Sequence, residues 1–270
     1  MDIESGYLPV DGTQIYYETA GQGEPLVLLH GNMLDSRMWD FNFLPLAQHF
    51  RVIRYDQRGY GKSGASNGRL GTADSDLLAL LDHLHIPTAH VCGSSMGGVV
   101  ATHFAFLHPE RTAGLILVNT DLSGFATTGD LADAILETRL LLEKADKAGA
   151  VRLWLGHPLL LPTQRYPQAY EHIQKIVADY NWENWLAGKS YLITPPVLKR
   201  LGEIQARTLV VTGENDLPRF AAIAELLCRK IPRSQRQIMA DTAHLSCLEK
   251  PEDFNGLVIR FLRSKLTAIH

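Results

Sequence analysis

Short runs of apolar, often β-branched residues alternate along the chain with longer segments whose apolar residues recur every three or four positions. The short runs predict strands, and the longer segments predict helices that bury one face. Parallel strands covered on both faces have this nearly continuous apolar character. The pattern therefore predicts an α/β fold, with a mostly parallel sheet between two layers of helices.

The individual elements follow from the same pattern. Strands are predicted at Gln14–Glu18, Pro25–Leu29, Arg51–Tyr55, His90–Gly93, Gly114–Val118, Thr208–Thr212 and Gln235–Met239, with an edge strand at Tyr7–Val10. The clearest helices are predicted at Asp74–Leu84, Met96–Leu107, Phe220–Lys230 and Asp253–Lys265. A turn at Asp11-Gly12 would join the edge strand to its neighbour.

The alternation stops over residues 121–202, which have helical periodicity but no convincing strand. One helix face is predicted to contain Leu131, Ile135, Leu142 and Ala145. The segment is too long for a loop, so we expect a helical cap at 121–202 inserted into a core domain of residues 1–120 and 203–270. Its aromatic residues, Trp154, Trp182 and Trp185 among them, would either form an apolar substrate pocket or pack the cap on the core.

Composition and charge exclude several functions. The chain has 270 residues and a net charge of -3, and no run of Lys or Arg exceeds two, so nucleic acid is not an expected partner. The N-terminus lacks the features of a secretory signal, and no apolar run approaches the roughly 18 residues of a membrane span. Three widely spaced cysteines fit a reducing compartment. We expect a cytoplasmic protein that does not bind membranes; a homodimer is compatible with the sequence.

The segment HVCGSSMGGVV contains the strongest candidate for chemistry. A G-x-S-x-G frame fits only around Ser95, since a frame around Ser94 would need glycine at positions 92 and 96. On a sharp strand-to-helix turn the central serine has a strained backbone, and side chains two positions away would collide. The first amides of the following helix could stabilise an oxyanion. The alternative is a glycine-rich turn whose serine only caps the helix.

A serine nucleophile needs a base and, usually, a carboxylate that orients the base. His244 follows the last predicted strand, and Asp216 follows the strand before it, so both would lie at the same edge of the sheet as Ser95. Asp121 is a rival for the acid, and Glu214 is a weaker one. No pair of histidines has metal-ligand spacing, so no metal is expected.

Five segments in order resemble the α/β-hydrolase family: LVLLHGNMLDSRMW, DQRGYGKS, GSSMGG, GENDLP and AHLSCLEKPEDFN. The resemblance implies an oxyanion hole formed by the amides of Met96 and Asn32, or of Met33 if the loop is shifted by one residue. The Asn32 side chain would either bind substrate or help the loop adopt its conformation.

No cofactor is expected from the glycine-rich segment DQRGYGKSG. A phosphate-binding loop would need glycine where Asp56 stands, and a dinucleotide site would need its glycines at the first strand-helix turn. Asp56 and Arg58 are instead predicted to hold a tight turn through hydrogen bonds.

A serine nucleophile predicts acyl transfer to water through an acyl-enzyme. The histidine segment is most similar to those of enol-lactone hydrolases and small serine carboxylesterases, so the expected substrate is a small-molecule ester or lactone. Carbon-carbon hydrolases of ring-fission products commonly have tryptophan after the histidine, where Leu245 stands. That reaction remains an alternative, as does a small-molecule receptor or signalling protein with residual hydrolase activity.

Overall fold

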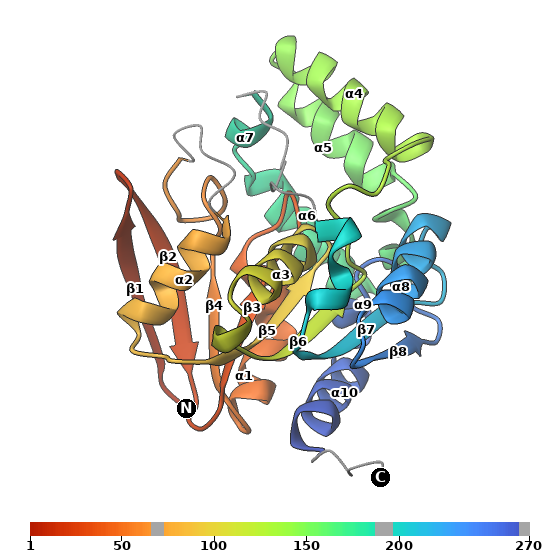
Figure 1. Cartoon of the computed structure of the whole chain (residues 1–270). Helices are drawn as coiled ribbons and strands as arrows, with labels where there is room; N and C mark the ends of the chain where they lie inside the picture. Colours follow the sequence, from red (N-terminus) through yellow and green to blue (C-terminus); the bar gives the residue numbers. More distant parts are fainter. Residues whose placement is uncertain (66–72, 187–196, 265–270) are drawn as a thin grey trace.

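A computed structural model describes residues 1–65, 73–186 and 197–264 (Figure 1). Eight strands form one sheet in the order β1-β2-β4-β3-β5-β6-β7-β8. They are β1 (Ile3–Val10), β2 (Thr13–Ala20), β3 (Pro25–Leu29), β4 (Arg51–Tyr55), β5 (Ala89–Ser94), β6 (Thr112–Val118), β7 (Arg207–Gly213) and β8 (Ser234–Met239). β2 runs antiparallel to β1 and β4, and all other neighbours are parallel. The mostly parallel sheet predicted from the sequence is confirmed.

Helices cover both faces of this sheet. The described α-helices, including those of the segment between β6 and β7, are α1 (Asp40–Ala47), α2 (Ala73–His83), α3 (Met96–Leu107), α4 (Asp130–Glu143), α5 (Lys147–Gly156), α6 (Pro167–Asp179), α7 (Glu183–Leu186), α8 (Pro218–Lys230), α9 (Ser246–Glu249) and α10 (Pro251–Arg263). α2 packs against α3, and α1 packs against α10 on the opposite face (Figure 1). Nearly every residue of β3, β5, β6 and β7 is therefore buried, which explains their continuous apolar sequences.

The described residues between β6 and β7 are helical and contain α4 to α7. We call residues 121–202 the insert; its positions 187–196 lie outside the described residues. α4 packs along α5 beyond the edge of the sheet at which the parallel strands end (Figure 1). Leu131 and Leu142 are buried on α4, as its periodicity predicts. The prediction for Ala145 was wrong: α4 ends at Glu143, and Ala145 has a φ of 58°, which terminates the helix.

Two further elements differ from the sequence prediction. α1 was not predicted, because Pro45 lies inside it and its apolar residues do not form a clear stripe. β1 begins at Ile3 rather than Tyr7, since it pairs with β2 along its whole length although most of its side chains are exposed. Backbone pairing at a sheet edge does not require an apolar pattern.

Candidate active site

Ser95 stands between the end of β5 and the start of α3, with a φ of 51° and a ψ of -116°. This conformation is costly for a residue with a side chain and is kept only where the surroundings enforce it. A side chain at Gly97 would collide with the backbone carbonyls of Leu29 and His30, and one at Gly93 would collide with the carbonyl of Gly97. The two glycines therefore allow the tight strand-helix contact that exposes Ser95 to the cavity.

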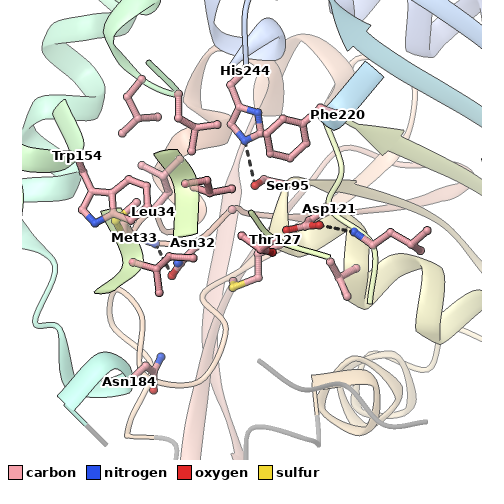
Figure 2. Close-up of a pocket in the computed structure, with 18 of the residues that line it drawn as sticks. Asn32, Met33, Leu34, Ser95, Asp121, Thr127, Trp154, Asn184, Phe220 and His244 are labelled. Carbon is pink, nitrogen blue, oxygen red and sulfur yellow. Dashed lines mark hydrogen bonds between the residues drawn. The ribbon is translucent and has the colours of Figure 1, made fainter. Parts of the chain in front are cut away.

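The structure brings Ser95, His244 and Asp216 together. The Oγ of Ser95 lies 3.0 Å from Nε2 of His244 (Figure 2), and Nδ1 of His244 lies 3.1 Å from each carboxylate oxygen of Asp216. The side chains of His244 and Asp216 are 3% and 2% exposed. In this arrangement the carboxylate holds the proton on Nδ1, so Nε2 is free to accept the serine proton.

Asn119 supports the acid and was not predicted. Its Nδ2 donates hydrogen bonds to Asp216 at 2.8 Å and to the carbonyl of Ala243 at 3.0 Å, while its Oδ1 accepts one from Ser246. Asp216 accepts a second hydrogen bond from the amide of Leu217 at 2.7 Å. The available signal was the position of Asn119, a polar residue directly after the buried strand β6.

The rival acids have other partners. Asp121 forms an ion pair with Arg219, whose guanidinium nitrogens lie 3.0 and 3.2 Å from its two oxygens, and it accepts a hydrogen bond from the amide of Leu122. Glu214 accepts a hydrogen bond from the amide of Asp241 at 2.9 Å. The geometry therefore favours Asp216 as the carboxylate partner of His244.

The loop after β3 lies beside Ser95 and contains Asn32 and Met33, the two alternatives for one amide of the predicted oxyanion hole. The amide of Met33 donates to the side-chain oxygen of Asn32 at 3.0 Å, so this amide is already engaged. Among the residues that the structure describes, the amide of Asn32 has no recorded partner. The amide of Met96 begins α3 and has no carbonyl one turn earlier in the helix. The amides of Asn32 and Met96 are thus the ones available to an oxyanion.

The side chain of Asn32 has a structural role in this loop. Its Oδ1 accepts hydrogen bonds from the amide of Met33 and, at 2.8 Å, from the hydroxyl of Tyr60. His30 fixes the loop from the other side: its Nδ1 donates to the carbonyl of Gly31, and its Nε2 accepts from the amide of Gln57. Burial lowers the pKa of His30 although the charge of Asp56 opposes the shift, which fits a neutral ring with these two partners.

The segment DQRGYGKS is structural, as predicted for Asp56 and Arg58. The carboxylate of Asp56 accepts hydrogen bonds from the amides of Ser36 and Lys62, both at 2.7 Å. Arg58 binds Asp76 on α2 through two nitrogens at 2.6 and 2.7 Å. These bonds tie the segment to the loop after β3 and to the helix layer.

Glu249 is a second buried residue that sequence reasoning missed. Its carboxylate accepts hydrogen bonds from the hydroxyl of Thr163 in the insert, at 2.8 Å, and from the amide of Ala243 next to His244. Burial raises the pKa of Glu249, and the two hydrogen bonds act against the rise. The side chain therefore links the insert to the loop that carries His244.

A cavity of about 340 Å³ opens above Ser95 (Figure 2). Its floor contains Ser95, His244 and Asn32, and its walls are mostly apolar side chains from the core and the insert: Leu34, Val99, Leu122, Phe125, Leu131, Ile135, Trp154, Leu159, Leu160, Trp185 and Phe220. The ring of Phe220 packs on the imidazole of His244 with centroids 4.3 Å apart. Such a cavity suits a small, largely apolar substrate.

The three tryptophans of the insert have different surroundings. Trp154 and Trp185 line the cavity, and their rings lie 5.9 Å apart. The indole nitrogen of Trp154 donates to the hydroxyl of Thr138 at 2.8 Å. Trp182 is fully buried and packs against Tyr180 and Trp185.

Two kinds of feature are absent from the described residues. They contain no cluster of three or more histidine, cysteine or acidic side chains that could hold a metal ion. No helix among them has the length and apolar character needed to cross a bilayer.

The family model described as alpha/beta hydrolase fold matches residues 24–251. The chain belongs to the α/β-hydrolase family. This hydrolase is 29% identical to 3-oxoadipate enol-lactonase 2 of Acinetobacter baylyi, over 93% of this chain and 94% of the relative. It is also 29% identical to 2-hydroxy-6-oxo-6-phenylhexa-2,4-dienoate hydrolase of Comamonas testosteroni, over 93% and 92% of the two chains.

This α/β hydrolase also resembles a solved structure. The enol-lactonase from Burkholderia xenovorans LB400 superimposes with a TM-score of 0.85 at 25% identity, covering 96% of this chain and 100% of the other. The sequence-level resemblance to the α/β-hydrolase family, with enol-lactonases among its relatives, is confirmed.

Proposed function

We propose that this hydrolase cleaves a carboxylic ester or an enol-lactone of a small molecule, with Ser95 as nucleophile, His244 as base and acid, and Asp216 as the orienting carboxylate. The observation that carries the proposal is the continuous chain of contacts from Asp216 through His244 to Ser95, at the floor of an apolar cavity. The resemblance to two enol-lactonases supports the substrate class.

The reaction follows from these positions. Nε2 of His244 takes the proton as Oγ of Ser95 attacks the carbonyl, and the amides of Asn32 and Met96 stabilise the oxyanion. Collapse of the tetrahedral intermediate transfers the proton from His244 to the leaving oxygen and leaves an acyl-enzyme. Water then repeats the attack with His244 as base, which releases the acid and restores Ser95.

The insert, in this proposal, is a cap that holds the apolar part of the substrate. Trp154 and Trp185 line the cavity from the insert, and Ser95 lines it from the core. Binding energy from this wall would position the carbonyl over the serine.

Two neighbouring serine variants test the proposal. Ser95→Ala should lower kcat for 4-nitrophenyl butyrate and for a small enol-lactone by about 10³-fold or more. The rate that remains would come from the oxyanion hole. Ser94→Ala is the matched control: Ser94 is fully buried, and its hydroxyl has no partner among the described residues, so most of the activity should remain. Equal losses in both variants would contradict the assignment. A single burst without steady turnover would favour the receptor alternative.

Carbon-carbon hydrolysis is the second candidate, because the Comamonas testosteroni relative is named for a dienoate substrate. Leu245 stands where such enzymes commonly have tryptophan, and the chemistry also requires a group that ketonises a dienol. We therefore expect kcat/KM for the ester or lactone to exceed that for a ring-fission dienol by about tenfold or more. Rapid dienol turnover with negligible ester hydrolysis would reverse the choice.

A further inference from the structure

One face of α4 forms part of the cavity wall and ends in a cation. Leu131, Ile135 and Arg139 follow one another at intervals of four residues, and all three line the cavity. That spacing places them on the same side of the helix, about one turn apart. The wall is thus apolar at Leu131 and Ile135 and carries a positive charge one turn further along.

The charge of Arg139 is not neutralised by a neighbour. Among the described residues, no hydrogen bond or ion pair is recorded for Arg139, and Glu143, one turn further along α4, lies beyond ion-pair distance. Helix geometry would bring an arginine and a glutamate four residues apart together if nothing else competed. Arg139 therefore has its guanidinium available to a molecule in the cavity.

The other ionisable groups of the wall do not balance this charge. Asp121 also lines the cavity, but Arg219 is paired with it at 3.0 Å. His244 is engaged with Asp216 and Ser95. Arg139 is exposed, so solvent screens its charge, but no other group of the described cavity wall competes for its guanidinium. The planar guanidinium also matches a carboxylate, which can accept two parallel hydrogen bonds.

We propose that Arg139 binds a carboxylate of the substrate while the ester or lactone carbonyl of the same molecule reaches Ser95. The inference rests on the proposed function and narrows it to substrates with an apolar middle and an anionic end. Leu131 and Ile135 contact that middle, and the distance between the two ends of the cavity selects the chain length.

A pair of matched esters tests this specificity. Mono-4-nitrophenyl glutarate carries a free carboxylate, and methyl 4-nitrophenyl glutarate carries a neutral ester at the same place. The wild-type protein should give a higher kcat/KM for the first, and Arg139→Gln should reduce that ratio by about tenfold or more, mainly through KM. Arg139→Lys should retain part of the preference, and succinate and adipate homologues should define the preferred chain length.

Arg152 supplies the control. It belongs to the same insert, its side chain is 72% exposed, and it is not among the cavity-lining residues. Arg152→Gln should leave the ratio unchanged. The proposal is overturned if the wild-type protein shows no preference for the carboxylate, or if both arginine variants lower the ratio equally.

A binding measurement separates this proposal from the proposed reaction. In Ser95→Ala, the fluorescence of Trp154 and Trp185 should report hexanoate entering the cavity, with 1-hexanol as the neutral probe. Adding Arg139→Gln should weaken hexanoate binding by about tenfold, and hexanol binding should change much less. If neither ester is hydrolysed by the wild-type protein, the proposed reaction fails, yet this measurement still decides the role of Arg139. Equal weakening of both probes, or no effect on hexanoate, contradicts the role.

Discussion

The loops at the sheet edge and the insert meet at one cavity, but they are held in different ways. Ser95, His244 and Asp216 stand on short loops whose backbone is fixed by close glycine packing and by buried hydrogen bonds such as those of Asn119. The described part of the insert contributes mostly apolar and aromatic surface, together with the cation Arg139. Under the proposed function, the reaction and the choice of substrate are separable: the loops would determine the bond that is attacked, and the insert would determine which molecule is bound.

Polar and aromatic contacts join the two regions. Arg37 after β3 pairs with Asp179 of α6 at 2.7 Å, and the rings of Tyr60 and Tyr180 stack with centroids 5.1 Å apart. Thr163 of the insert binds the buried carboxylate of Glu249. Variants of either region are therefore judged by both kcat and KM.

The largest effect is expected from the acid. Asp216→Asn should lower kcat by about 10⁴-fold, because an amide stabilises the wrong tautomer of His244. Asp121→Asn should cost less than about tenfold, since Asp121 pairs with Arg219 rather than with the histidine. Steady-state kinetics with one ester compares the two directly. The reverse ranking would move the acid to Asp121.

A pair of tryptophan variants tests the insert. Trp182→Ala removes a fully buried ring and should cost about 3–5 kcal/mol of unfolding free energy. Trp185→Ala removes a half-buried ring that faces the cavity, so it should raise KM for aryl esters by about tenfold with little change in kcat. Denaturant titration and kinetics of both proteins measure the two effects. A large fall in kcat for Trp185→Ala would mean that the insert takes part in the chemistry.

A variant of Asn119 tests how much the positioning of Asp216 by this loop contributes to kcat. Asn119→Ala removes a hydrogen bond to the carboxyl group of Asp216 and one to the carbonyl of Ala243, so we expect kcat to fall by about tenfold or somewhat more. KM should change little, because Asn119 is not among the cavity-lining residues. An effect confined to KM would contradict a role in positioning the acid.

The smallest expected effect is on the way the free energy of unfolding depends on pH. Burial lowers the pKa of His30, so below about pH 6.5 the unfolded chain takes up a proton that folded His30 does not. The free energy of unfolding should therefore decrease as pH falls through this range, by at most about 1.4 kcal/mol per pH unit for one group. Glu249, whose pKa burial raises, contributes with the opposite sign, since the folded state retains its proton to higher pH.

Matched histidine variants isolate the contribution of His30. His30→Asn should reduce the dependence of stability on pH between about 7.5 and 5.5, whatever its effect on stability itself. His85→Asn is the control, because His85 is exposed and asparagine accepts its positive φ of 55°. Urea titrations at several pH values provide the measurement. An unchanged slope in His30→Asn would contradict the assignment.

The predictable parts of the structure are those with a local signal in the sequence. The strands and the positions of Ser95, His244 and Asp216 could be predicted, because glycine spacing and polar residues after buried strands leave few alternatives. Asn119 and Glu249 were missed, since their roles depend on contacts between distant segments. α4 ends before Ala145 because Ala145 has a positive φ, and the spacing of apolar residues does not predict that conformation.

The central claim is that Ser95 is a nucleophile activated by His244, and covalent labelling tests it most directly. A fluorophosphonate should react with the wild-type protein, and tandem mass spectrometry of the peptide that spans Ser94 and Ser95 should locate the adduct on Ser95. His244→Ala should slow the labelling by about 10³-fold or more, because Nε2 at 3.0 Å no longer accepts the serine proton. An adduct on Ser94, or an unchanged rate in His244→Ala, would contradict the account.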